Sequence, residues 1–385
     1  MPLNPVTHIM AFLEQPGTSA FSGAENHLAI LMKAQAQAGQ RVELCALAYS
    51  FEEELVERLN ELSGSGIEIQ RFKLKKTDSW IIHQAREARL VFELGNFLKS
   101  RKNNIVHAHM DLAGRVGRLA ARKAGCKNIV ISFHNNPPSY ASGTKKAELL
   151  FLDRFTSRSI AISGAVHELL VDTVGIPSEK VDVIRYGLAS PALPRPSDVL
   201  RDEIGIPRDA FVAGLVGRLT EQKNIPLFIN ALERLPDVFG VIVGAGKLES
   251  ELRGLAESKG IRNIKFLGYR ANSVEITSCF DVFCLPSRWE GLGLVLIEAM
   301  FQNVPIIGSR AGAIPEILSN GEYGLLFDSD DLDGLIRNIE HARDNRQEML
   351  DMAERAKDYA GKTFTVDAML SRTTAFYDKV LNDKN

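Results

Sequence analysis

A chain of 385 residues with 45% hydrophobic and 24% charged residues has the composition of a globular protein with one large or two ordinary domains. Its formal net charge of −2 argues against a general nucleic-acid-binding protein. The four cysteines show neither C-x-x-C spacing nor the density of a disulfide framework, which indicates thiols in a reducing compartment. The first residues lack a signal-peptide pattern, and no apolar run approaches the ~20 residues that span a bilayer, so we expect a cytoplasmic protein.

Positive charge is concentrated in the first half of the chain. Residues 1–190 contain 23 Lys/Arg against 19 Asp/Glu, whereas the remainder contains 23 against 29. Within the segment 71–127, 14 basic residues face only 4 acidic ones. Two interpretations stay open: a set of solvated helix faces, or a field that attracts a phosphorylated acceptor or the inner face of the cell membrane as a peripheral contact.

Short β-branched runs alternate with segments of helical periodicity along the first half, which is the pattern of parallel sheets covered by helices. Amphipathic segments at 24–37 and 112–124 are predicted as helices, and Ser163 is predicted to cap another. The runs that we predict as strands span residues 7–12, 41–48, 67–72, 104–109, 128–133, 159–162 and 180–184.

A proline-rich segment at 186–196 interrupts this alternation and predicts a linker. The alternation resumes with predicted strands at 211–216, 239–243, 264–267, 281–285 and 305–308. The chain is therefore predicted to form two doubly wound α/β units joined near residue 190. Ligands of such sheets bind beyond the carboxyl ends of the strands, so we expect the functional residues directly after strands and the site between the two units.

Basic residues follow the first predicted strand of the second unit. Gly217 permits a tight turn there, and Arg218 and Lys223 place two cations between the strand end and the next helix. A guanidinium offers a planar fork for phosphate oxygens and an ammonium a mobile charge, which suits a diphosphate. The next strand leads into Gly244 and Gly246 but lacks the third glycine of a dinucleotide fingerprint. These glycines permit either close approach of the backbone to a ligand or a tight strand–helix turn.

Two carboxylates flank a glycine-containing helix start in the segment 284–300. Glu290 follows a predicted strand, and Glu298 lies eight positions later on the following helix. Gly291 and Gly293 free the backbone N–H groups at this helix start to meet an anion. The carboxylates suit hydrogen bonds to sugar and ribose hydroxyls. Helix capping for Glu290 and solvent exposure for Glu298 are the alternatives, although an unpaired carboxylate in an apolar helix is costly.

Residues 210–330 resemble the nucleotide-binding half of the family-four retaining glycosyltransferases, which have the GT-B fold of two Rossmann-like domains facing a central cleft. The end of the chain, from Phe364 to Tyr377, resembles that family's last helix, which crosses back to the first domain. The residues that carry the resemblance of 210–330 are Gly217, Arg218, Lys223, Glu290, Glu298, Asn303, Pro305, Gly312, Pro315, Glu316, Ile317, Gly321, Gly324, Leu325 and Leu326.

The resemblance implies three parts: an N-terminal acceptor-binding domain at 1–190, a nucleotide-sugar-binding domain at 191–365 and a C-terminal helix at 366–385. It implies transfer of a hexose-type sugar from a UDP- or GDP-sugar to a hydroxyl acceptor with retention of configuration. Bacterial surface polysaccharide or lipid-linked glycan synthesis is the expected setting.

The implied roles in the second half centre on the diphosphate and the sugar. Arg218 and Lys223 would hold the diphosphate, Glu290 would bind donor-sugar hydroxyls, and Glu298 would hold the ribose. The further residues predicted to contact the nucleotide-sugar are Gly23, Gly217, Gly244, Gly246, Leu267, Tyr269, Gly291, Leu292, Gly293 and Leu294.

Two motifs in the first half enter the same interpretation. The loop before Ala24 resembles the family's Gly-Gly-Ala-Glu loop with Ser22 in place of one glycine, and Gly23 would let it pass close to the diphosphate. His107 and His109 share a strand face, and Asp111 could converge with them.

This H-x-H-x-D pattern also begins metal sites in some hydrolases and is compatible with structural packing. The family interpretation instead predicts that His109 lies beside the donor sugar and the arriving acceptor. His134, after the next strand, is expected to border the acceptor pocket.

Asp328-Ser329-Asp330 resembles the metal motif of the other major glycosyltransferase fold, but it directly precedes a helix, so Asp330 is predicted as a helix cap. We expect no metal and no cofactor besides the donor, because Arg218, Lys223 and a helix end supply the positive charge. Two other functions stay open: a sugar-nucleotide epimerase or hydrolase on the same scaffold, and a non-catalytic nucleotide-sugar-binding subunit.

Overall fold

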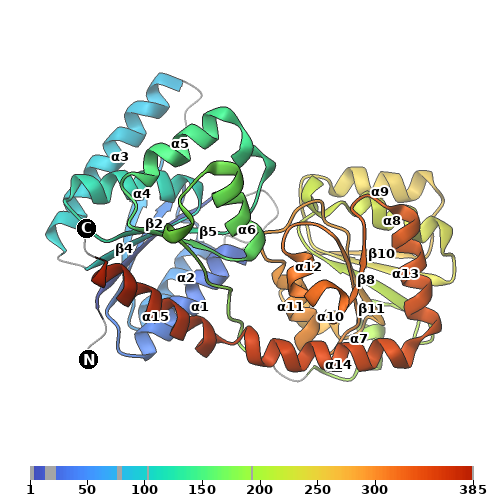
Figure 1. Ribbon diagram of the computed structural model, residues 1–385. Coiled ribbons are helices and arrows are strands. Elements are labelled where there is room, and N and C mark those ends of the chain that lie inside the picture. The colour runs from blue at the N-terminus through green and yellow to red at the C-terminus, as the bar shows by residue number, and fades with distance from the viewer. Residues whose placement is uncertain (1–3, 14–22, 76–79, 102–103, 192–193, 384–385) are drawn as a thin grey trace. The chain divides into compact units, whose positions relative to one another are not determined.

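The structure is a computed structural model (Figure 1), and the residues that it describes are 4–13, 23–75, 80–101, 104–191 and 194–383. They form two compact units. The first contains the described residues up to Leu188 together with the last helix from Val366 onward, and the second spans Ala189–Thr365.

The first unit is built on a parallel seven-stranded sheet with the order β3-β2-β1-β4-β5-β6-β7. Each predicted strand of this half is confirmed, with ends that shift by at most one residue. β1, β2, β4 and β5 are buried along their whole length, which explains why most of their residues are apolar. The strands are β1 (Val6–Phe12), β2 (Val42–Ala48), β3 (Glu68–Lys73), β4 (Ile105–His109), β5 (Ile129–Phe133), β6 (Arg158–Ala161) and β7 (Val181–Val183).

Helices cover both faces of this sheet (Figure 1). Helices α3, α4 and α5 lie on one face, and α1, α2 and α15 on the other. Ser163 caps α6 as predicted, because its Oγ accepts a hydrogen bond of 3.2 Å from the N–H of Val166. The helices are α1 (Gly23–Gln37), α2 (Glu53–Gly64), α3 (Trp80–Ser100), α4 (Asp111–Lys123), α5 (Gly143–Asp153), α6 (Gly164–Glu168) and α15 (Val366–Asn382), with short turns of other helix types at Pro138–Ala141, Leu169–Val174 and Ser178–Lys180.

The second unit has a parallel six-stranded sheet with the order β10-β9-β8-β11-β12-β13. The five strands predicted from the sequence are present. The sixth, β13, was not predicted as a strand, because three residues at a sheet edge carry too little periodicity. The strands are β8 (Phe211–Val216), β9 (Val238–Val243), β10 (Ile264–Gly268), β11 (Val282–Leu285), β12 (Ile306–Ser309) and β13 (Leu325–Phe327).

The helices of the second unit again cover both sheet faces. The start of α13 corrects one prediction. The helix cap is Asp331 and not Asp330, because Oδ1 of Asp331 accepts a hydrogen bond of 2.9 Å from the N–H of Gly334. The Oδ1 of Asp330 instead accepts hydrogen bonds from Asn224 and Arg288. The helices are α7 (Ser197–Ile204), α8 (Ile225–Arg234), α9 (Glu249–Ser258), α10 (Ser273–Thr277), α11 (Leu294–Phe301), α12 (Ile314–Ile317), α13 (Leu332–Asp344) and α14 (Arg346–Thr363), with 3-10 turns η4 (Glu221–Lys223) and η5 (Ser319–Gly321).

Candidate active site

The strand order of each sheet reverses direction at its centre. In the second unit the reversal lies between β8 and β11, which pair side by side although two strands separate them in sequence. Chains that leave such neighbouring strands in opposite directions open a crevice at their carboxyl ends. Arg218 and Lys223 follow β8, and Glu290 follows β11. The fold therefore places at one end of the sheet three of the residues that the sequence singled out for the donor.

Lys223 and Glu290 form an ion pair at this point. The Nζ of Lys223 lies 2.5 Å from Oε1 of Glu290, and the Oγ of Ser287 donates to the same oxygen at 2.8 Å. Both charged residues are nearly inaccessible, with exposed fractions of 9% and 5%. Gly217 makes room for the lysine, since a Cβ there would lie 3.1 Å from Cε of Lys223. Paired and buried in this way, both charges have fixed positions.

Backbone contacts hold the two loops of this pair together. Gln222 accepts from the N–H of Arg288 at 2.8 Å through its carbonyl, and its side chain donates to the carbonyl of Trp289 at 2.9 Å. The carbonyl of Glu290 accepts from the N–H of Ala313 at 3.1 Å. Glu290 is therefore not a helix cap, which was one alternative from the sequence. It belongs to a loop that is fixed on both sides.

Arg218 differs from Lys223 in its surroundings. Its side chain is exposed, and among the described residues its guanidinium has no hydrogen bond or ion pair. An unpaired guanidinium beside a buried ion pair leaves a net positive charge at the end of β8. Such a charge, with a planar fork of donors, is available to an anionic ligand.

The start of α11 lies directly after Glu290 in the chain. Gly293 adopts a left-handed conformation with φ +79°, and no side chain of the described residues caps the helix. Leu292 is buried, and Gly291 is buried as well. A helix start without a side-chain cap carries the positive end of the helix dipole and suits a negative group. Leu294, the first helical residue, is partly exposed.

Glu298 lies on α11, and its side chain is partly exposed. No described residue forms a hydrogen bond or ion pair with its carboxylate. Burial raises the pKa of Glu298 to about 7, and the positive charge of Lys223 opposes this shift. About half of these carboxyl groups are therefore ionised at neutral pH, and no described residue donates a hydrogen bond to them. A ligand hydroxyl can donate that hydrogen bond.

Gly244 and Gly246 pack against protein backbone. A Cβ on Gly244, whose φ is +140°, would lie 1.9 Å from the carbonyl oxygen of Gly217. A Cβ on Gly246 would lie 2.5 Å from the carbonyl oxygen of Leu219. The loops after β8 and β9 thus touch backbone to backbone, which explains the need for glycine without a ligand. Their predicted contact with the donor stays a prediction.

Leu267 and Tyr269 lie at the end of β10, at the edge of the sheet and separated from β8 by β9. Leu267 is partly exposed, and 57% of Tyr269 is exposed. Both residues thus lie at the same end of the sheet as Lys223, but nearer to the edge of the sheet. In the first unit, Gly23 is the first residue of α1, and the loop 14–22 before it lies outside the described residues.

His109 ends β4, which pairs with β1 where the strand order of the first sheet reverses. Its ring is buried, with Nε2 3.0 Å from Nδ1 of His8 and Nδ1 3.1 Å from Nε2 of His134. Both ring nitrogens therefore face other histidines. Asp111 does not converge with His107 and His109 as expected. It starts α4 and accepts hydrogen bonds from Tyr140 and Lys145 instead.

Sequence reasoning singled out His107, His109 and His134 but missed His8, which belongs to the same cluster of imidazoles. His8 pairs in register with His107 on the neighbouring strand, so the alternation of side chains along β1 and β4 was the available signal. His8, His107 and His109 lie close enough to hold a metal ion, with ligand atoms within 4.8 Å of one another. Each of their ring nitrogens already has a hydrogen-bond partner in this structure.

Burial depresses the basicity of the whole cluster. It lowers the pKa of His8 to about 4 and that of His134 to about 3. The pKa values of His27, His107 and His109 are also well below the usual range, first through burial and then through the neighbouring imidazoles. These rings are neutral at physiological pH.

Comparison with known proteins matches both halves of the chain to glycosyltransferases. The family model described as "Glycosyltransferase Family 4" covers residues 21–189, and the one described as "Glycosyl transferases group 1" covers residues 197–359. The chain belongs to the family-four glycosyltransferases. Of the functions considered from the sequence, the comparisons thus support a glycosyltransferase with the GT-B fold.

Curated relatives of this family-four enzyme include two bacterial glycosyltransferases. A UDP-Gal:alpha-D-GlcNAc-diphosphoundecaprenol alpha-1,3-galactosyltransferase from Escherichia coli is 29% identical over 68% of this chain and 72% of its own length. A D-inositol 3-phosphate glycosyltransferase from Corynebacterium glutamicum is 26% identical over 73% of each chain. Among solved structures, Anabaena HepE in complex with UDP and glucose has a TM-score of 0.82 at 22% identity, over 97% of this chain and 100% of HepE, which confirms the fold.

Proposed function

We propose that this glycosyltransferase transfers a hexose from a UDP- or GDP-sugar to a hydroxyl acceptor with retention of the anomeric configuration. The observation that carries the proposal is the ion pair of Lys223 and Glu290 at the strand-order reversal, with the unpaired cation of Arg218 beside it in sequence. Positive charge, a buried carboxylate and an uncapped helix start follow the two central strands of one sheet. That combination matches a sugar diphosphate, which has two phosphates next to a ring of hydroxyls.

The leaving group determines what the cations do. As the bond between the anomeric carbon and the phosphate oxygen breaks, negative charge accumulates on the diphosphate. Arg218 and Lys223 would stabilise that charge, helped by the start of α11, and fixed charges do so without reorganisation during the reaction. The acceptor oxygen then bonds to the anomeric carbon, and its proton passes to the departing phosphate oxygen on the same face of the sugar.

The two carboxylates would orient the donor. Glu290 would accept hydrogen bonds from sugar hydroxyls while Ser287 and Lys223 hold it in place. Glu298 would accept from the ribose. In this proposal the reaction needs no protein nucleophile and no metal, because the positive charge that a metal would supply comes from protein groups.

The relatives give a direction for the substrates. The name of the Escherichia coli relative includes a UDP-sugar donor and a diphosphoundecaprenol acceptor, and HepE was solved with UDP and glucose. On this support we take a UDP-hexose as the first donor to test, with GDP-hexoses as the alternative, and a glycan or lipid-linked glycan as the acceptor class.

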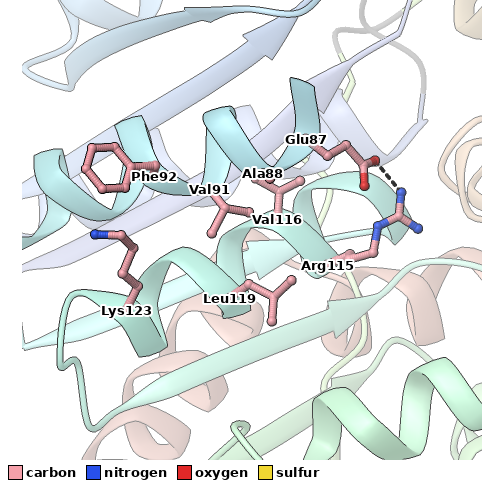
Figure 2. Close-up of a pocket in the computed structure, with 8 residues that line it drawn as sticks. All are labelled: Glu87, Ala88, Val91, Phe92, Arg115, Val116, Leu119 and Lys123. Carbon is pink, nitrogen blue, oxygen red and sulfur yellow. Dashed lines mark hydrogen bonds and ion pairs between the residues drawn. The ribbon is translucent and has the colours of Figure 1, made fainter. Parts of the chain in front are cut away.

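A lipid-linked acceptor would bring the protein to a membrane surface, and one face of the first unit suits this. None of the described helices has the length and hydropathy to span a bilayer. Between α3 and α4, however, lies a groove of about 450 Å³ with an apolar floor (Figure 2). Lys123 lies 4.0 Å from the ring centre of the exposed Phe92 at one end. Exposed cations on and after these helices are Arg89, Lys99, Arg122, Lys123 and Lys127.

We therefore include a peripheral contact of this face with anionic lipids in the proposal. Exposed cations attract an anionic surface over a Debye length, and an aromatic side chain can enter the headgroup region.

The experiment for the main proposal is a transfer assay with purified protein, a panel of UDP- and GDP-hexoses, and lipid-linked or oligosaccharide acceptors. NMR of the product reports the anomeric configuration. A donor that is turned over only when acceptor is present supports the proposal. Equally fast hydrolysis or epimerisation without acceptor, or an inverted product, contradicts it.

A further inference from the structure

The histidines of the first unit belong to a longer chain of hydrogen bonds whose direction can be worked out from one amide. Gln35 on α1 is buried, and its Oε1 lies 2.9 Å from Nε2 of His8. Since an amide oxygen only accepts, His8 must donate through Nε2.

From His8 the chain of hydrogen bonds continues to the ends of β4 and β5. A neutral imidazole has one N–H and one lone pair, so His8 accepts through Nδ1. Its partner, Nε2 of His109 at 3.0 Å, is therefore the donor. By the same logic, Nδ1 of His109 accepts from Nε2 of His134 at 3.1 Å. His134 then accepts through Nδ1 from the hydroxyl of Tyr186.

His107 belongs to a separate set of hydrogen bonds. Its Nδ1 lies 2.7 Å from the hydroxyl of Tyr377, and its Nε2 lies 2.7 Å from Oγ of Ser132. Every link is thus satisfied by neutral rings, and the neutral state agrees with the low pKa values that burial gives these histidines.

We propose that the chain from Gln35 through His8, His109 and His134 to Tyr186 locks His109 and His134 as Nε2–H tautomers, with His8 and Gln35 as positioning residues for them. The inference rests on the proposed function in that His109 and His134 are expected beside the sugar and the acceptor. His134 is partly exposed, whereas the remaining members are buried. A substrate group can therefore reach the chain at this member.

The direction of the chain sets what kind of group His134 receives. Its Nδ1 carries a lone pair and accepts from the hydroxyl of Tyr186. A sugar hydroxyl that shares or replaces this contact would donate its proton in the same direction. A phosphate oxygen could not, because it has no proton to offer. The chain therefore makes this end of the cluster selective for hydroxyl groups.

A metal ion and this chain exclude each other. A metal held by His8, His107 and His109 would need a lone pair on Nε2 of His109 or would break its contact with His8. In the chain that nitrogen carries a proton. The state of Nε2 of His109 therefore distinguishes the two arrangements.

The test is 15N NMR of the full-length protein labelled at histidine, recorded near pH 7.5 first without a chelator and then with one. The histidine resonances are assigned with single substitutions. We expect His8, His109 and His134 to show protonated Nε2 and unprotonated Nδ1. A protonated Nδ1 in His8, His109 or His134, or a metal bound to Nε2 of His109, overturns the proposal. This readout does not depend on activity, so it stays informative if the proposed reaction is wrong.

The positioning role has its own variant. Gln35→Leu removes the acceptor of the N–H at Nε2 of His8. We expect kcat to fall on the order of tenfold, the contribution of one buried hydrogen bond, with the KM for the donor unchanged. Gln347→Leu, which removes an exposed amide on α14 in the second unit, is the control and should keep the wild-type kcat. A Gln35→Leu enzyme as active as this control overturns the positioning role.

Discussion

Lys223 and Glu290 stand 67 residues apart in the sequence, yet Nζ and Oε1 lie 2.5 Å apart and join the loops after β8 and β11. This pair changes what a substitution of Lys223 reports. If Lys223 only bound the diphosphate, Lys223→Ala would remove turnover and leave the fold intact. Because the lysine is the partner of a buried carboxylate, stability and catalysis should fall together.

Arg218→Ala should separate catalysis from stability. Its side chain is exposed and unpaired among the described residues, so the free energy of unfolding should change by less than about 0.5 kcal/mol. The value of kcat/KM should fall roughly 100-fold, the usual effect of losing one group that stabilises transition-state charge. Lys223→Ala should instead lower the free energy of unfolding by roughly 3–5 kcal/mol. Denaturant titration and steady-state kinetics of both variants check the contrast, and equal stabilities would contradict the buried pair.

Glu298 should release a proton when the donor binds near pH 7. With a pKa of about 7, roughly half of the carboxyl groups are protonated there. Ribose hydroxyls donate to the ionised form, so binding lowers the pKa and releases about half a proton. Calorimetric titration in two buffers of different ionisation enthalpy measures this number. Glu298→Gln should bring it close to zero, and the same release in that variant would assign it elsewhere.

The histidine cluster should make the first unit sensitive to acid. The unfolded state takes up protons near pH 6.5, whereas the folded pKa of His8 is about 4 and that of His134 about 3. Stability is therefore complete above pH 6.5 and is lost as the pH falls toward these folded values. Each such histidine contributes about 1.4 kcal/mol per pH unit in that window.

Urea titrations between pH 4 and pH 7.5 measure this slope. His134→Gln should make the loss less steep by about one histidine. His167→Gln removes a histidine outside the cluster and is the control. A slope that does not change in His134→Gln would show that this ring is not held neutral.

The face of α3 and α4 should bind anionic vesicles. Replacing Arg122 and Lys123 by glutamate changes the local charge by −4, and a Lys123 ammonium no longer lies against Phe92. We expect flotation with phosphatidylglycerol vesicles to be lost and binding to phosphatidylcholine to be weak in every variant. Lys357→Glu/Lys362→Glu on α14 carries the same charge change and should still float. Loss of binding in both double variants would indicate a general charge effect and not this face.

Most strands and the donor residues could be predicted because both leave local signals. Buried parallel strands are continuous apolar runs, and Arg218, Lys223 and Glu290 follow such runs directly, where a doubly wound sheet places its site. For Asp330, the local signal was not enough to predict its role. Its neighbour Asp331 is an equally good cap by residue type, and only the geometry of α13 distinguishes the two.

Partners across the fold could not be predicted. His107 bonds Tyr377 at a separation of 270 residues, and His8 bonds His109 at a separation of 101. No local pattern contains such pairs, because they depend on strand order and on where the last helix packs. The same holds for Gly244 and Gly246, for which the sequence left a ligand contact and a tight turn open. The backbone that they contact, at Gly217 and Leu219, belongs to another loop.

The proposed contact of Arg218 and its neighbours with the diphosphate of the donor can be measured by calorimetry. The affinities of UDP and UMP are compared for the wild type and for Arg218→Ala, with GDP and GMP if the donor proves to be a GDP-sugar. The ratio of the two affinities isolates the terminal phosphate from the base and the ribose. We predict that UDP binds much more tightly than UMP to the wild type, and that this ratio shrinks roughly 10- to 100-fold in the variant. An identical ratio in both proteins would show that Arg218 does not bind the terminal phosphate.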